Sequence, residues 1–154
     1  MKLAKLIVTF FFIGQAKIAP GSLASLVLTL LFYVIATNLV FSIFIIYILA
    51  TTVFSFFVIQ FYTTEFIEKD RSEIVIDEVV GQSLALLTLL FFAEKEPPEI
   101  HMCLISFICF RFFDIVKPYP IYLFDKMNNA FGIIFDDILA GIFSAIILTL
   151  VFII

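Results

Sequence analysis

Acidic side chains occur in two short motifs with the same layout, in which a pair of acids precedes a glycine. The motifs are Asp77 and Glu78 before Gly81, and Asp136 and Asp137 before Gly141. In each motif one acid lies four residues before the glycine, so the two share one face of a helix. Glycine there lets a second backbone approach closely in lipid, and carboxylates at a helix start complement its positive end. One such pair is ordinary at a helix start; two pairs favour a shared site.

A third cluster combines both signs of charge. Arg111, Asp114 and Lys117 follow one another at three-residue spacing, which places them on roughly one helical face. Pro118 and Pro120 then predict the end of that helix. Arg111 and Asp114 either contribute to a site or simply neutralise each other near the membrane surface.

Negative charge exceeds positive charge in these clusters, which suits a divalent cation. Mg²⁺ binds carboxylate oxygens, and a bound cation lets an anionic phosphate enter a site that would otherwise repel it. Arg111 can hold phosphate with two parallel bonds, Lys117 as a point charge, and Gly21 and Ser22 through amides at a helix start. The acidic set predicted to bind metal is Asp77, Glu78, Asp114, Asp136 and Asp137. Metal-assisted phosphoryl chemistry is therefore predicted.

The sequence lacks the residues that other phosphatase mechanisms require. The sole histidine, His101, lies in a loop away from every cluster, and neither cysteine is followed six positions later by an arginine. Cys103 and Cys109 also lack the spacing of a zinc site, and we expect them to be buried thiols. Without an aspartyl nucleophile motif of the haloacid dehalogenase kind, a metal-activated water is the simplest nucleophile.

The composition indicates an integral membrane protein. Of the 154 residues 64% are hydrophobic and 14% are charged, whereas about 25% are charged in soluble domains. No basic run suggests a nucleic acid partner.

Uncharged runs predict an all-α bundle of about five transmembrane helices in a single membrane-embedded domain, residues 1–154. The run 18–64 is long enough for two spans with a turn at Asn38. Residues 6–13 form an apolar run too short to cross, so we expect an interfacial or re-entrant segment there. The helices are predicted near 22–37, 39–62, 79–93, 100–116 and 137–154.

Lysine and arginine are unevenly divided between the two sides of this arrangement. Eight lie on one side and Lys95 alone lies on the other, which predicts a cytoplasmic N-terminus and a cytoplasmic site. The eight are Lys2, Lys5, Lys17, Lys69, Arg71, Arg111, Lys117 and Lys126. The start of the chain is also similar to a secretory signal with a cleavage site at 14–16, but export of Lys17 would invert this bias.

Four ordered motifs resemble those of the phosphatidylglycerophosphatase A family across nearly the whole chain. PGSLASL at 20–26 is similar to PGTxGSL, with Ser22 and Ala24 as departures, and DRSEIVIDEVVG at 70–81 is similar to DPxxIVxDExxG, with Arg71 as a departure. FRFFDIVKPYPI at 110–121 matches FRxFDxxKPxPI throughout. GIIFDDILAG at 132–141 is similar to GIMxDDxxAG.

The resemblance implies a Mg²⁺-dependent hydrolase that converts phosphatidylglycerophosphate to phosphatidylglycerol at the cytoplasmic leaflet of a bacterial inner membrane. It implies that the five acids act together, with Arg111 and Lys117 facing phosphate.

Two other functions are alternatives to this one. A CDP-alcohol phosphotransferase would also gather aspartates near the cytoplasmic face, but its extended aspartate motif is absent. A non-enzymatic ion pathway would use intramembrane carboxylates, whereas these acids are predicted at helix ends on one side only.

Overall fold

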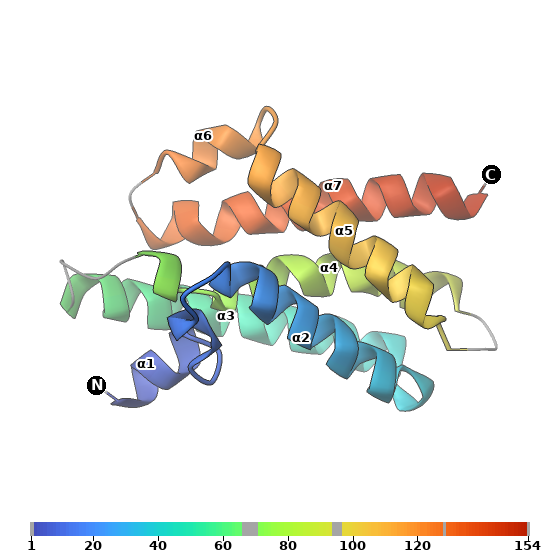
Figure 1. Ribbon diagram of the computed structural model, residues 1–154, viewed down its shortest axis with the longest axis horizontal. Helices are drawn as coiled ribbons and strands as arrows, with labels where there is room; N and C mark the ends of the chain where they lie inside the picture. The colour runs from blue at the N-terminus through green and yellow to red at the C-terminus, as the bar shows by residue number, and fades with distance from the viewer. Residues whose placement is uncertain (1, 66–70, 94–96, 128, 154) are drawn as a thin grey trace.

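The computed structural model describes residues 2–65, 71–93, 97–127 and 129–153, and these residues form helices and turns without a strand (Figure 1). The predicted all-α fold is thereby confirmed. The helices are α1 (Lys2–Val8), α2 (Pro20–Ile35), α3 (Phe41–Glu65), α4 (Ile76–Phe92), α5 (Ile100–Val116), α6 (Ile121–Asp125) and α7 (Ala130–Ile153), with 3₁₀ turns η1 (Ile13–Gln15), η2 (Ala36–Asn38) and η3 (Arg71–Glu73).

Three helices in the described part of the chain are long and apolar enough to cross a membrane. They cover Pro20–Asn38, Phe41–Thr63 and Ala130–Phe152. The prediction of about five spans is not supported, because α4 and α5 have 17 residues each. At 1.5 Å per residue such a helix reaches about 26 Å, short of the roughly 30 Å hydrocarbon core.

Helix α4 is central to the bundle and packs most extensively against α7. The glycines of the two acidic motifs meet where these helices cross. A Cβ built on Gly141 would lie 2.3 Å from the carbonyl oxygen of Gly81, and one built on Gly81 would lie 2.5 Å from that of Asp137. The close approach expected of these glycines is therefore present, and it places the two acidic motifs side by side.

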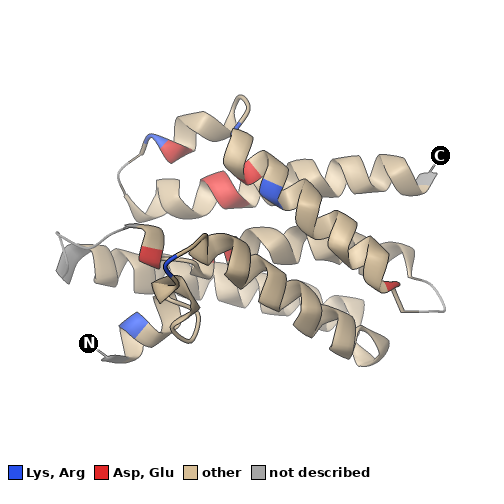
Figure 2. Cartoon of the chain, viewed as in Figure 1, with Lys and Arg blue, Asp and Glu red and all other residues tan. Residues whose placement is uncertain are grey.

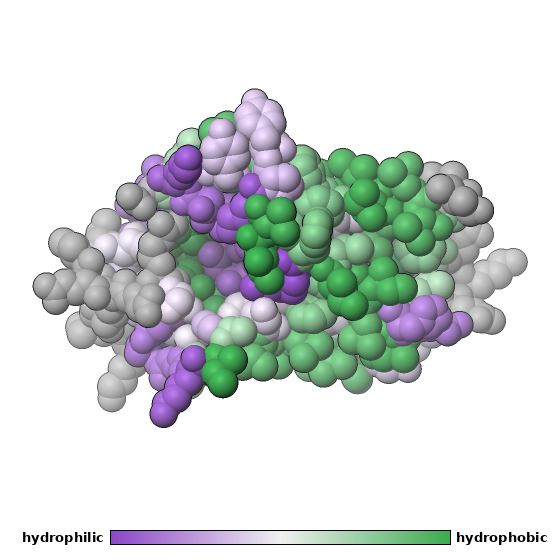
Figure 3. Space-filling model, turned by 45° about the horizontal axis from the view of Figure 1, so that its top comes forward, coloured by the Kyte–Doolittle hydropathy of each residue, from purple (hydrophilic) through white to green (hydrophobic). Residues whose placement is uncertain are grey.

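The charged residues gather at one end of the molecule, here called the polar end (Figure 2). It contains the starts of α2, α4 and α7, the end of α5, and α6 (Figure 1). The space-filling view shows hydrophilic surface concentrated there, while most of the remaining face is hydrophobic (Figure 3). This distribution suits a site at one boundary of a membrane, with apolar helices extending away from it.

Helix α7 begins earlier than predicted. The Asn129 side chain accepts a hydrogen bond from the amide of Gly132 at 2.8 Å, which is the bond of a helix N-cap. Asp136 and Asp137 therefore lie about two turns inside the helix. The expectation that they complement a helix start is wrong for this motif, although Asp77 and Glu78 do lie in the first turn of α4.

The N-terminal segment does not form one of the three candidate spans. Helix α1 ends at Val8, and the chain then turns through Phe10, Phe11 and Phe12, whose φ angles are 41°, 56° and 69°. The carbonyl of Val8, which is fully buried, accepts a hydrogen bond from the amide of Val75 at 2.9 Å. This bond fixes the N-terminal segment against the start of α4, close to its acidic motif.

Candidate active site

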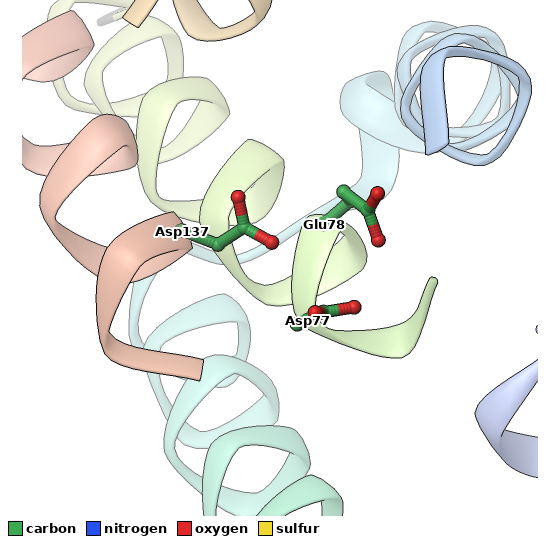
Figure 4. A group of neighbouring side chains, drawn as sticks. All are labelled: Asp77, Glu78 and Asp137. Carbon is green, nitrogen blue, oxygen red and sulfur yellow. The ribbon is translucent and has the colours of Figure 1, made fainter. Parts of the chain in front are cut away.

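Three of the five predicted metal-binding acids lie together at the α4–α7 crossing (Figure 4). Asp77 and Glu78 come from α4 and Asp137 from α7, and one carboxylate oxygen of each lies within 4.8 Å of the others. Asp77 and Asp137 are buried, and the Glu78 side chain is 15% exposed. These residues are called the carboxylate trio below.

Each member of the carboxylate trio has a buried oxygen without a hydrogen-bond partner. These atoms are Asp77 Oδ1, Glu78 Oε2 and Asp137 Oδ1. Unpartnered buried carboxylates are costly, so their convergence calls for a cation. Opposite oxygen ligands of Mg²⁺ are about 4.2 Å apart, so the trio fits such an ion after a small side-chain adjustment.

Arg111 reaches the carboxylate trio from the end of α5. Its Nη1 forms an ion pair with Asp114 and lies 4.0 Å from Glu78 Oε1. The mutual neutralisation of Arg111 and Asp114 considered from the sequence is therefore present. Nevertheless, Nε of Arg111 is buried without a hydrogen-bond partner, while Nη1 contacts carboxylates through ion pairs. Because guanidinium nitrogens are donors only, the unpartnered Nε suits an anion beside the carboxylate trio.

The start of α2 lies against Glu78 and Arg111. A Cβ built on Gly21 would lie 1.9 Å from Glu78 Oε1 and 3.4 Å from Arg111 Nη1, so a side chain at this position would displace the Glu78 carboxylate. Pro20 occupies the first helical position, and Ser22 is half-buried. The amides of Gly21 and Ser22 precede the hydrogen bond that Leu23 donates to Ala19, and thus belong to the open end of the helix.

Lys117, predicted to face phosphate, is engaged with two carboxylates. Its Nζ donates to Asp125 Oδ1 and to Asp136 Oδ2, both at 2.6 Å. Partial burial lowers the pKa of Lys117, but the hydrogen bonds to Asp125 and Asp136 outweigh that effect and raise the pKa above its usual value. Lys117 is therefore a permanent cation.

Both carboxylate oxygens of Asp136 have hydrogen-bond partners of their own, which distinguishes this acid from the carboxylate trio. While Oδ2 accepts from Lys117, Oδ1 accepts from the amide of Asp137 at 3.1 Å. The structure thus divides the five predicted acids into three that converge, one paired with Arg111 and one paired with Lys117.

Asp125 was missed from the sequence because its contact depends on how the chain folds back after α5. Lys117 has φ 45° and ends α5, and Pro118 and Pro120 follow. Helix α6 then packs against α7, and its last residue is Asp125. The two prolines were the available signal: they predicted the end of a helix, but not the direction in which the chain continues.

Comparison with known proteins identifies the family of this chain. A family model described as phosphatidylglycerophosphatase A matches residues 6–152. A relative of that name from Haemophilus influenzae is 34% identical over 87% of this chain and 79% of its own length. Another from Escherichia coli is 28% identical over 88% of this chain and 75% of its own length. No solved structure matches. The chain therefore belongs to the phosphatidylglycerophosphatase A family and is a lipid phosphatase, a phosphoric monoester hydrolase.

Proposed function

We propose that this protein hydrolyses phosphatidylglycerophosphate to phosphatidylglycerol and phosphate, and that the reaction requires Mg²⁺. The choice of lipid rests on the family and on the names of the two relatives. The requirement for a cation rests on the carboxylate trio. The observation that carries it is the convergence of three carboxylates, each with an unpartnered buried oxygen, within 4.8 Å.

Asp77, Glu78 and Asp137 are the residues that would hold the cation. When bound, Mg²⁺ supplies positive charge for the phosphate and lowers the pKa of a coordinated water. Without a cation the carboxylate trio repels an anionic headgroup, so the same residues explain why substrate binding would depend on metal. The ligand set consists of oxygen atoms alone, which suits a hard cation such as Mg²⁺.

Arg111 is the residue best placed to bind the terminal phosphate. Its side chain is 15% exposed, and its buried Nε lacks a hydrogen-bond partner. Asp114, three residues further along α5, pairs with the same guanidinium. A planar guanidinium orients a phosphate through parallel bonds and stabilises charge that develops on its oxygens.

The open end of α2 provides a second set of donors. Gly21 lies directly against Glu78 and Arg111, and the amides of Gly21 and Ser22 carry the partial positive charge of a helix start. A glycine at this point allows the phosphate to approach the backbone. Arg111 and the start of α2 therefore bind the anion, while the carboxylate trio holds the cation.

We further propose that the polar end faces the cytoplasm. Lys5, Lys17, Lys117 and Lys126 belong to the cation-rich side, whereas Lys69 and Lys95 lie outside the described residues. Both α4 and α5 have their charged ends at the polar end, so the asymmetry does not depend on how many helices cross.

A cysteine replacing Lys126 should resist an impermeant thiol reagent in intact cells, and one replacing Lys95 should react; the reverse pattern would refute this orientation.

The activity can be tested with purified protein in detergent micelles containing phosphatidylglycerophosphate. Phosphate release should stop with excess chelator and return with Mg²⁺. Phosphatidic acid, a lipid phosphomonoester without the second glycerol, tests the choice of headgroup, and Asp137→Asn identifies phosphate released by a contaminant. Undiminished release in excess chelator would refute the metal requirement, and preference for phosphatidic acid would refute the proposed substrate.

A further inference from the structure

Lys117 lies between two carboxylates that come from different helices. Its ammonium contacts Asp125 of α6 and Asp136 of α7 at the same distance, 2.6 Å. The Asp136 side chain is 7% exposed, whereas that of Asp125 is 45% exposed. The lysine therefore links a buried acid beside the carboxylate trio to an acid at the surface of the polar end.

This link extends to the carboxylate trio through Asp136. Its second carboxylate oxygen accepts a hydrogen bond from the backbone amide of Asp137 at 3.1 Å. The charge on Lys117 thus holds the carboxylate that contacts the backbone of a trio member. Residues that make such contacts orient the metal-binding groups and do not bind the metal themselves.

The position of α6 is fixed by close packing on the first turn of α7. A Cβ built on Gly132 would lie 2.6 Å from the carbonyl oxygen of Phe124 and 2.5 Å from Met127 Cβ. The ring of Phe124 also stacks on that of Phe135, with centroids 5.7 Å apart. Asp125, which follows Phe124, is therefore presented to Lys117 by a helix that cannot shift freely.

We propose that Asp125 and Lys117 are positioning residues for the metal site, acting through Asp136 to hold Asp137 toward the two α4 acids. The inference rests on the proposed function, since it assigns a role toward the cation held by the carboxylate trio. It also gives the two cations at the end of α5 different roles: Arg111 faces the phosphate, and Lys117 positions the acids.

The alternative role of Lys117, direct binding of phosphate, predicts opposite effects. If Lys117 bound phosphate, Asp125 would compete with the substrate, and Asp125→Asn would lower KM and leave kcat unchanged. If Lys117 positions Asp136, the same change should lower kcat about 10-fold and leave KM for the lipid unchanged.

Direct metal binding gives a readout that does not depend on activity. Mn²⁺ binding to the full-length protein in detergent can be followed by electron paramagnetic resonance. Removal of a positive charge in Lys117→Met would by Coulomb's law alone strengthen cation binding. The positioning role predicts the reverse, an affinity about 10-fold weaker, with partial recovery in Lys117→Arg.

A double-mutant cycle tests whether the two residues act as one unit. In the Lys117→Met background, Asp125→Asn should add less than about twofold to the loss of Mn²⁺ affinity. The matched control is Glu99→Gln, which removes another exposed acid, one that pairs with His101 at the start of α5, the end of that helix away from the polar end; it should change nothing.

Tighter Mn²⁺ binding in Lys117→Met, additive losses in the cycle, or a lowered KM in Asp125→Asn would overturn the inference. These results are distinguishable from failure of the proposed function. If the wild-type protein released no phosphate from phosphatidylglycerophosphate, the binding arm would still decide whether Lys117 and Asp125 position a cation site.

Discussion

The two acidic motifs have the same layout in the sequence but different surroundings in the fold. Both acids of the α4 motif, Asp77 and Glu78, belong to the carboxylate trio, and each has an unpartnered oxygen. In the α7 motif only Asp137 does, because both oxygens of Asp136 are engaged by Lys117 and by a backbone amide. Two acids in sequence therefore need not have the same role, and a neighbouring cation decides which of them remains available.

The largest effect is expected within α7, where the two neighbouring acids should respond differently to substitution. Asp137→Asn should lower phosphate release by more than about 100-fold, since it removes a predicted ligand, whereas Asp136→Asn should cost about 10-fold by loosening its neighbour. The measurement is kcat for phosphatidylglycerophosphate at saturating Mg²⁺. Equal losses in the two variants would contradict the division of roles.

The next effect concerns Arg111. Arg111→Lys keeps the charge but loses the planar fork, and should lower kcat about 100-fold, as loss of a transition-state donor does. The double change Arg111→Ala with Asp114→Ala removes both partners of the ion pair, and should leave a folded, inserted and inactive protein. An active double variant would exclude both residues from the site.

A smaller effect is expected at the crossing that brings the motifs together. In Gly141→Ala the new Cβ would meet the Gly81 carbonyl at 2.3 Å, so the helices must separate. Overpacking of this kind costs about 1–3 kcal/mol, and we expect a lowered unfolding temperature in detergent with reduced activity.

The control for this change is Val151→Ile, which adds one methyl group to the same helix where the side chain is 60% exposed. It should leave both quantities unchanged. Wild-type stability in Gly141→Ala would show that the helices do not approach as closely as the glycines indicate.

Much of the site could be predicted from the sequence because its residues lie in short local patterns. The spacing of acids and glycines anticipated the α4–α7 contact, and the Arg111–Asp114 pairing follows from a three-residue separation on one helix. Local spacing cannot show which acids a distant cation will neutralise. The contact of Lys117 with Asp125 and Asp136 requires the chain to reverse after α5, and no repeat or period in the sequence records that reversal.

The predicted span count is not supported and the predicted start of α7 was wrong, and both outcomes have a physical reason. Charge-free runs indicate where lipid is tolerated, but α4 and α5 have only 17 residues each, and each carries charged residues of the site at one end. Residues 130–135 were left outside the last predicted helix, which began near 137, although Asn129 is a recognisable N-cap.

The central claim is that the carboxylate trio forms one divalent cation site to which the two acidic motifs contribute unequally. Mn²⁺ binding measured by electron paramagnetic resonance, in the wild-type protein, Asp136→Asn and Asp137→Asn, tests this claim most directly. We expect Mn²⁺ binding to be lost in Asp137→Asn and weakened about 10-fold in Asp136→Asn. Unchanged binding in Asp137→Asn, or loss of binding only in Asp136→Asn, would contradict it.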